Sequence, residues 1–318
     1  MNKPISKYAE NVDSSKVIRV AYQGVPGAFG EIAAKKHFLR VETVSQPKFR
    51  DVFKVVENGT VEYGLVPVEN TTEGAINEIY NLLLNSKVKI VGEEVIRVSQ
   101  CLIANPGVKI ENVEMIYSHP QALGQCMEFI NKSGIPQHAS DNTAMGAKMI
   151  RDGNIMNAAA IASEEAARIY GMEVLQRDIQ DNKDNYTRFL VLGHIIPQPT
   201  GDDKTSLLIA LEHTPGSLAK ALEPFTSTNM LDIEKRPLVG RPFEYIFFVD
   251  FEGHIYEGRI NEPVKVLKDR STGIKFLGSY PKSPDFGKVQ IGIRRQLEVS
   301  FSTDLQFLEE IWKRRLEG

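Results

Sequence analysis

A threonine and an arginine, Thr187 and Arg188, stand where a polar, turn-prone stretch changes into an apolar one. The polar stretch contains Asp184 and Asn185, and the apolar stretch at residues 189–193 predicts a strand. A hydroxyl beside a guanidinium at a strand end has the chemistry to bind an anion and to hand it a proton. Such a pair is more often structural, so it indicates a site only if other polar side chains converge on it.

Polar side chains follow another predicted strand at a similar corner. Asn70 and Thr71 come after an apolar stretch at residues 63–69 and before a helical pattern at residues 75–85. In open α/β sheets, ligands bind at such carboxyl ends of strands. The same position also suits a helix N-cap, which is the structural alternative.

Two further corners carry hydroxyl and amide groups. Ser118 is the expected N-cap of a helix that holds Gln121 and Gln125, and their four-residue spacing places both amides on one helix face. Thr143 lies in a polar turn, residues 140–144, that precedes another helix. The six histidines show no HxxxH or HxH spacing. We therefore expect a metal-free pocket for an anion.

The composition is that of an ordinary globular protein. Of 318 residues, 42% are hydrophobic and 25% are charged, and the net charge is −3. This balance argues against a dedicated nucleic-acid binder, and there is no run of ~18 apolar residues to predict a membrane span. Cys101 and Cys126 have no CxxC spacing, so we expect buried thiols in a reducing, cytoplasmic compartment.

The alternation of strands and helices sets out the expected domains. Residues 1–16 are polar and predict a flexible tail, with no secretory signal. Residues 17–194 predict an α/β domain of two lobes, whose last strand crosses back between them. Residues 195–204 have the composition of a linker, and residues 205–281 follow the βαββαβ order of a ferredoxin-like domain. Residues 282–318 predict an extension with an amphipathic helix.

Five short motifs stand at the polar corners. They are AYQGVPGAF at residues 21–29, VPVEN at 66–70, SHPQAL at 118–123, DNTA at 141–144 and NYTRF at 185–189. Their types and order resemble the prephenate dehydratases, of the monofunctional kind without a chorismate mutase domain. The resemblance implies a two-lobed catalytic domain like a type II periplasmic binding protein, with the active site in the cleft. It also implies that the ferredoxin-like domain is an ACT regulatory domain.

The resemblance also implies a reaction and assigns roles. Prephenate would lose its ring carboxylate as CO2 and its C4 hydroxyl as water, giving phenylpyruvate without any cofactor. By the family pattern Thr187 donates a proton to the leaving hydroxyl. A Thr hydroxyl is a poor acid, so Arg188 is expected to assist it, while Phe189 shapes the pocket. The residues expected to hold the substrate by hydrogen bonds are Asn70, Thr71, Ser118, Gln121, Gln125, Thr143 and Asn185.

Two motifs of the ACT domain are associated in the family with phenylalanine binding between such domains. The family's Gly-Ala-Leu-Val appears here at residues 216–219, and its Glu-Ser-Arg-Pro appears at 234–237 with Lys235 in place of the serine. Phenylalanine is therefore the expected effector, and pairing of these domains implies a homodimer or homotetramer. The residues expected to bind the effector are Gly216, Ser217, Leu218, Glu234, Arg236 and Pro237.

Two alternatives remain open at this point. Arogenate dehydratases share all five motifs, and arogenate carries an ammonium group where prephenate has a keto group. A two-lobed sensor of small anions would share the fold and would bind its ligand without consuming it. Turnover of the ligand separates the sensor from both enzymes.

Overall fold

The computed structural model describes residues 17–237 and 245–285 of the chain. The expected N-terminal tail and the amphipathic helix of the C-terminal extension lie outside the described residues. All helices and strands discussed below belong to one compact unit, Met1–Lys282. Within the described ranges, the helices are all too short or too polar to cross a membrane.

The first sheet holds the strand of Thr187. Its strands lie in the order β2-β1-β3-β11-β5, with a short β4 paired to β3. The first three are parallel, whereas β11 runs antiparallel to both β3 and β5. The strands are β1 (Ile18–Gln23), β2 (Val41–Gln46), β3 (Tyr63–Asn70), β4 (Gly74–Ala75), β5 (Lys89–Arg97) and β11 (Tyr186–Gly193). The helices of this lobe are α1 (Phe29–His37), α2 (Phe49–Glu57) and α3 (Asn77–Asn85).

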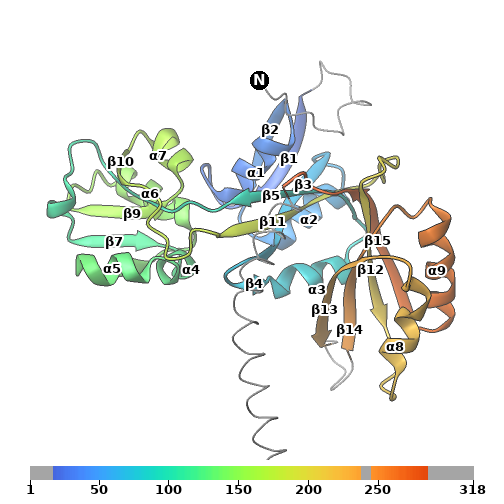
Figure 1. Cartoon of the computed structure of the whole chain (residues 1–318). Coiled ribbons are helices and arrows are strands. Elements are labelled where there is room, and N and C mark those ends of the chain that lie inside the picture. The colour runs from blue at the N-terminus through green and yellow to red at the C-terminus, as the bar shows by residue number, and fades with distance from the viewer. Residues whose placement is uncertain (1–16, 238–244, 286–318) are drawn as a thin grey trace, which may run out of the picture. The chain divides into compact units, whose positions relative to one another are not determined.

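The second sheet lies between β5 and β11 in the sequence. Its order is β10-β6-β9-β7-β8. Its strands are β6 (Cys101–Ala104), β7 (Met115–Ser118), β8 (Gln137–Ala139), β9 (Ala158–Ala162) and β10 (Glu173–Gln176). Its helices are η2 (Ile110–Asn112), α4 (Pro120–Gly124), α5 (Met127–Ser133), α6 (Thr143–Asp152) and α7 (Glu164–Tyr170). The chain leaves the first sheet after β5 and returns as β11, and these two strands lie side by side (Figure 1). Two lobes with a strand crossing back are therefore confirmed.

The third sheet has the predicted βαββαβ order, and its strands lie in the order β13-β14-β12-β15. Its elements are β12 (Asp203–Ala210), α8 (Ser217–Leu222), η3 (Glu223–Phe225), β13 (Met230–Pro237), β14 (Tyr245–Glu252), α9 (Gly258–Asp269) and β15 (Gly273–Pro281). Strand β12 includes the last two residues of the expected linker, Asp203 and Lys204. The Asp203 carboxylate accepts hydrogen bonds from the backbone of Thr200 and Gly201, and Lys204 is fully buried. Both residues are therefore fixed within the fold.

The first and third sheets share one hydrophobic core. Leu190 of β11 packs in the same buried cluster as Phe248 of β14 and Leu277 of β15. The backbones of β5 and β15 approach so closely that a Cβ on Gly278 would lie 1.9 Å from the carbonyl oxygen of Ile90. A larger residue than glycine would force these strands apart. The third sheet is thus packed directly against the strand pair that carries Thr187.

Candidate functional site

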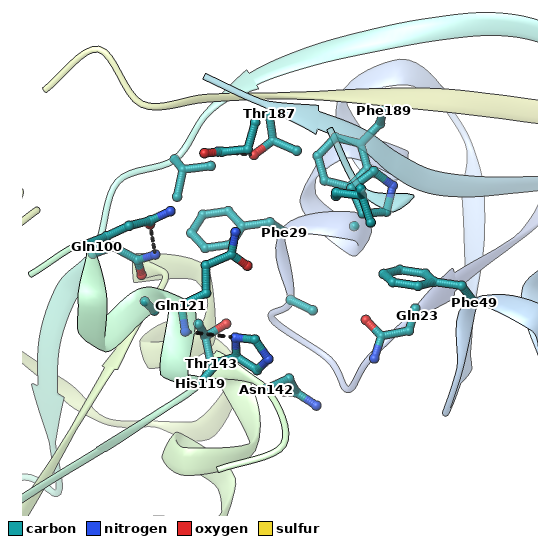
Figure 2. Close-up of a pocket in the computed structure, with 18 of the residues that line it drawn as sticks. Gln23, Phe29, Phe49, Gln100, His119, Gln121, Asn142, Thr143, Thr187 and Phe189 are labelled. Carbon is teal, nitrogen blue, oxygen red and sulfur yellow. Dashed lines mark hydrogen bonds between the residues drawn. The ribbon is translucent and has the colours of Figure 1, made fainter. Parts of the chain in front are cut away.

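A cavity of about 310 Å³ is lined by residues of both lobes and of the strands that join them. Thr187 and Phe189 of β11 face it from one side, and Gln121, His119 and Thr143 of the second lobe face it from the other (Figure 2). Of the residues expected to form the site, six line this cavity: Asn70, Gln121, Gln125, Thr143, Thr187 and Phe189.

Alternation along β11 decides which of its side chains reach the cavity. Successive side chains of a strand point to opposite faces, so Thr187 and Phe189 share one face and Arg188 points to the other. Thr187 lies opposite Asn70 in the β3–β11 ladder, and the register shifts between Arg188 and Phe189. The shift leaves Val68 of β3 as the extra residue, so the bulge belongs to β3, and β11 stays in register with β5 from Tyr186 to Val191. The alternation of side chains at Thr187, Arg188 and Phe189 is therefore kept.

The Asn70 side chain has a fixed orientation. Its Oδ1 accepts hydrogen bonds from the backbone N–H groups of Thr72 and Glu73, at 2.9 and 3.1 Å. The Nδ2 group must therefore point the other way, where it donates to Thr187 Oγ1 at 2.9 Å and to Asn185 Oδ1 at 2.7 Å. The two backbone N–H groups can only donate, so the Asn70 atom that faces them must be the oxygen. The side-chain amide of Asn70 therefore cannot be flipped.

The orientation of Asn70 also fixes the orientation of the next side-chain amides. Since Asn185 Oδ1 is an acceptor, its Nδ2 is the donor, and it donates to Gln125 Oε1 at 3.0 Å. Gln100 Nε2 approaches the same oxygen at 3.5 Å, a weak contact. We call Asn70, Asn185, Gln125 and Gln100 the amide row. It ties Thr187 to both lobes, because Gln125 lies in the second lobe directly after α4.

The amide row determines where the Thr187 proton points. The hydroxyl oxygen already accepts the Asn70 N–H, so the hydroxyl hydrogen must be donated elsewhere, and Thr187 lines the cavity. An N–H donor also stabilises the negative charge that grows on the oxygen as the proton leaves. The side chain is only 8% exposed, which strengthens this interaction. The geometry therefore suits Thr187 for donating a proton into the cavity.

The structure corrects the expectation that Arg188 assists Thr187. Arg188 leaves the opposite face of β11, where its Nε lies 2.9 Å from Glu93 Oε2 and its Nη2 contacts the Asp250 carboxylate and the Tyr280 hydroxyl. Asp232 Oδ2 lies 3.6 Å from Nη1. These partners are held by β5 and by the third sheet, and Arg188 is 5% exposed. Its guanidinium is committed to this buried cluster, which lies away from the cavity.

Three of the expected substrate ligands do not line the cavity. Ser118 is fully buried and its hydroxyl donates to the Ile161 carbonyl at 2.6 Å, so His119, and not Ser118, is the N-cap of α4. Thr71 uses its hydroxyl to hold the loop before β11, donating to the Asp184 carbonyl. Asn185 is 1% exposed and acts within the amide row. Their hydroxyl and amide groups are satisfied inside the protein, so they shape the site indirectly.

The far wall of the cavity is made of helix starts. His119 Nδ1 accepts the backbone N–H of Gln121, and burial lowers the pKa of the ring, although Asp141 acts in the opposite direction. Thr143 follows Asn142, which caps α6 by accepting the Met145 N–H. His119 is thus the N-cap of α4, and its ring also lines the cavity.

The lining carries no arginine or lysine within the described part of the chain, and Asp141 is its one charged residue. Two helices of nine or more residues begin at the cavity: α1, after its N-cap Ala28, and α6, after its N-cap Asn142. The first N–H groups of a helix have no partners within the helix and carry partial positive charge. These helix starts suit an anion.

Gln100 is a lining residue that the sequence reasoning missed. It lies in the segment between β5 and β6, where no turn or helix signature marks it. In the part of the chain that the structure describes, no cluster of three His, Cys, Asp or Glu side chains has the arrangement of a metal site.

The residues expected to bind an effector lie at the start of α8 and on β13, in the domain built around the third sheet. Gly216 is the left-handed N-cap of α8, which begins with Ser217 and Leu218. Glu234, Arg236 and Pro237 lie on β13, the edge strand.

Two cations of β13 make aromatic contacts. Arg236 donates to Glu234 at 3.0 Å and to Asn77 of α3, and its guanidinium lies 4.6 Å from the centre of the Tyr80 ring. The Lys235 ammonium lies 3.5 Å from the centre of the Tyr245 ring. Arg236 therefore links the effector motif to a helix of the first lobe.

Comparisons with known proteins yield one family. The model of the family described as prephenate dehydratase matches residues 20–195. A relative from Arabidopsis thaliana, named arogenate dehydratase/prephenate dehydratase 2, chloroplastic, is 42% identical over 294 residues, covering 88% of this chain and 77% of the relative. The structure of a prephenate dehydratase from Arthrobacter aurescens, in complex with L-Phe, is 26% identical with a TM-score of 0.77, covering 88% of this chain and 100% of that one. A structure described as a novel type of quorum quenching acylase is 31% identical with a TM-score of 0.78, covering 84% and 98%.

Proposed function

The chain belongs to the prephenate dehydratase family, and we propose that it converts prephenate to phenylpyruvate, CO2 and water. The observation that carries this proposal is the hydrogen bond from Asn70 Nδ2 to Thr187 Oγ1 at the wall of the cavity. It leaves the Thr187 proton available for a bound hydroxyl, which is what loss of water from prephenate requires. The enzyme is thus a carbon–oxygen lyase.

The proposed reaction is a single elimination across the ring. The bond between the ring and its carboxylate breaks, and CO2 departs. The electron pair of that bond moves into the ring, which becomes aromatic, and the C4–oxygen bond breaks. The leaving oxygen takes the Thr187 proton and departs as water, and Thr187 regains a proton from solvent. Aromatisation supplies the driving force, so positioning and one proton transfer are the main tasks of the protein.

Asn70 is proposed to make the Thr187 hydroxyl a usable acid. A hydroxyl gives up its proton more readily when a donor stabilises the oxygen that remains. The Asn70 N–H does this at 2.9 Å. The backbone N–H groups of Thr72 and Glu73 hold Asn70 in this orientation, and Asn185 and Gln125 continue the amide row from it. In this assignment Arg188 has no part in the proton transfer itself.

The two carboxylates of the substrate are proposed to bind at the helix starts. Thr143 at the start of α6 lines the cavity, and so do Ala28 and Phe29 at the start of α1. Gln121 and Gln125 add side-chain amides, and Phe189 packs against the ring. Binding by neutral donors allows one carboxylate to depart as CO2 without breaking a salt bridge.

A regulatory role is proposed for the third sheet, as an ACT domain that spans residues 205–281. Its fold has the ACT order, and the related structure from Arthrobacter aurescens is in complex with L-Phe. Phenylalanine is therefore the proposed effector, with Gly216, Ser217, Leu218, Glu234, Arg236 and Pro237 as its site. A homodimer or homotetramer and a cytoplasmic location stay predictions from the sequence.

Arogenate is the second candidate substrate, and Asp141 is the observation that favours it. This carboxylate lines the cavity and is the residue there best suited to an ammonium group. The relative from Arabidopsis thaliana carries both activities in its name. An Asp141→Asn variant should lose turnover of arogenate selectively if the ammonium binds here.

Incubation with each substrate tests the proposal directly. Prephenate should yield phenylpyruvate, read by its absorbance in alkali, and arogenate would yield phenylalanine. The proposed reaction is wrong if the folded protein binds prephenate and returns it unchanged, which is the behaviour of a sensor. If arogenate alone is consumed, the reaction class holds and the substrate changes.

A further inference from the structure

The guanidinium of Arg188 contacts side chains from three strands of the third sheet. Its Nη2 contacts the carboxylate of Asp250 on β14 and the hydroxyl of Tyr280 on β15, the latter at 3.4 Å. Its Nη1 lies 3.6 Å from Asp232 on β13. Glu93 on β5 lies 2.9 Å from Nε. Asp250, Tyr280 and Asp232 therefore hold Arg188 from outside the two lobes that form the cavity.

The partners of Arg188 are themselves fixed. Asp250 and Tyr280 are fully buried, and Ser206 bonds both, with its Oγ 2.5 Å from Asp250 Oδ1 and 2.7 Å from the Tyr280 hydroxyl. The Lys204 ammonium lies 2.8 Å from Glu93 Oε2. Buried ionic groups of this kind have few alternative arrangements, because each displaced charge would lose its counter-charge. The position of the guanidinium is therefore set jointly by Glu93 of β5 and by the third sheet.

The backbone carries this constraint to Thr187. Arg188 is its direct neighbour on β11, and the register of the β3–β11 ladder shifts just after Arg188. The extra residue at this shift is Val68 of β3, and on its other edge β11 pairs with β5 without a break from Tyr186 to Val191. Because Arg188 and Thr187 are adjacent in this regularly paired strand, a displacement of one moves the other. A shift of Arg188 would move the Thr187 hydroxyl relative to Asn70, with which it makes its 2.9 Å hydrogen bond.

We propose that Arg188 is a positioning residue, and that Asp250 of the third sheet sets the place of the Thr187 hydroxyl through it. This inference rests on the proposed function, in which Thr187 donates the proton. Arg188 touches neither the substrate nor the leaving oxygen. Through Arg188 the third sheet influences the position of the Thr187 hydroxyl. A change in that sheet therefore alters kcat and leaves substrate binding nearly unchanged.

An Asp250→Asn variant tests whether Asp250 positions Thr187 through Arg188, because asparagine has nearly the same shape as aspartate. We expect kcat with prephenate to fall about tenfold and KM to stay within about twofold, because a misplaced donor weakens the proton transfer more than binding. Ser206→Ala removes one hydrogen bond to the same carboxylate and should lower kcat by about threefold. The Ser206→Ala variant replaces Asp250→Asn in this test if Asp250→Asn yields too little folded protein.

Phe225→Leu is the matched control. Phe225 stacks on Phe251 in a separate core cluster of the third sheet, with ring centres 3.8 Å apart. The variant should lower the melting temperature and leave kcat unchanged at a temperature where the protein is folded. A kcat loss in Phe225→Leu equal to that of Asp250→Asn would show a general effect of instability and would overturn the proposal.

A double-mutant cycle separates this proposal from the proposed function. In a Thr187→Val background, Asp250→Asn should lower the residual rate by less than about twofold, because the group it positions is absent. An equal loss in both backgrounds would overturn the positioning role, as would an Asp250→Asn enzyme with wild-type kcat. Failure of the proposed function looks different, because Thr187→Val alone would then keep wild-type turnover.

Discussion

The two faces of strand β11 are built from opposite chemistry. On the cavity face, Thr187 is surrounded by neutral amides, and Asn70 is its hydrogen-bond donor. On the other face, one residue along the chain, Arg188 meets Glu93 and Asp250 in a buried ionic cluster. Adjacent residues of one motif thus serve different tasks, because a strand turns successive side chains to opposite sides.

The difference follows from what each face must do. A group that releases a proton needs a donor that stabilises the oxygen left behind, and a neutral amide provides this without binding the substrate carboxylates too firmly. A group that anchors a strand needs strong, directional contacts, and a buried guanidinium with several carboxylates provides those. Variants on the Arg188 face should therefore lose mainly stability, and variants on the Thr187 face should lose mainly kcat.

Arg188→Met should show the largest effect on stability. It leaves the buried carboxylates of Glu93 and Asp250 without their main counter-charge, and breaking a buried ion pair in this way costs about 3–5 kcal/mol. Chemical denaturation measures the loss. Arg188→Lys keeps the charge and should lose less, and an Arg188→Met protein as stable as wild type would contradict the anchoring role.

Asn70→Leu should damage the cavity face instead. Without the N–H donor, the Thr187 hydroxyl becomes a poorer acid, and we expect kcat to fall about 100-fold. Steady-state turnover of prephenate, with circular dichroism to verify folding, measures this. Asn85→Leu, at the exposed end of α3, is the control and should keep wild-type kcat. A loss confined to KM would contradict activation by Asn70.

Asn77→Ala tests whether the third sheet also reaches the first lobe through Arg236. Asn77 accepts a hydrogen bond from Arg236 at the start of α3, next to Ile76, which lines the cavity. If phenylalanine acts on turnover as proposed, half of its effect should need about fivefold more phenylalanine in this variant, because coupling free energies of this kind are about 1 kcal/mol. Titration of prephenate turnover with phenylalanine measures it. An unchanged titration would exclude this contact from the coupling.

Asp232→Asn should have the smallest effect, visible in the pH dependence of stability. Burial, followed by the charge of Asp250, raises the pKa of Asp232 to about 7, against the opposing effect of Arg188, with Glu69 and Glu234 adding to the rise. Between about pH 4 and pH 7 the folded chain holds a proton that the unfolded chain has released, so the free energy of unfolding falls as pH rises.

The Asp232→Asn variant cannot bind or release this proton. Its free energy of unfolding should therefore not show the part of the decrease with pH that Asp232 causes. We expect that part to be on the order of 1 kcal/mol, because the Asp232 side chain is 22% exposed and solvent screens its charge. Denaturation at several pH values compares the two proteins. Parallel curves for the variant and the wild type would show that Asp232 titrates normally in the folded chain.

The sequence predicted the fold and part of the site for physical reasons that are visible in particular residues. Strand–turn–helix corners located Asn70, Gln125 and Thr143, because local chemistry shapes such corners. The role of Arg188 needed partners more than sixty residues away, which no local pattern reveals. One signal was present: Glu93 and Asp250 are charged residues within apolar strands, and such residues require buried partners.

The distinction between Ser118 and His119 shows a second limit. Both residues are chemically suited to an N-cap, and the choice depends on the carbonyl of Ile161, on a strand far along the chain, which accepts the serine hydroxyl. Alternation along β11 was present in the sequence, but the expectation that Arg188 assists Thr187 did not use it. In a strand, Thr187 and Phe189 point to one face and Arg188 to the other.

Turnover of prephenate by Thr187→Val tests the central claim most directly. Valine keeps the shape of threonine and removes only the hydroxyl, so the folded variant should lose about 1,000-fold in kcat, while Thr187→Ser should stay within about tenfold of wild type. Thr60→Val, in an exposed turn after α2, controls for the substitution itself. A folded Thr187→Val enzyme within tenfold of wild-type kcat would contradict the assignment of Thr187 as the proton donor.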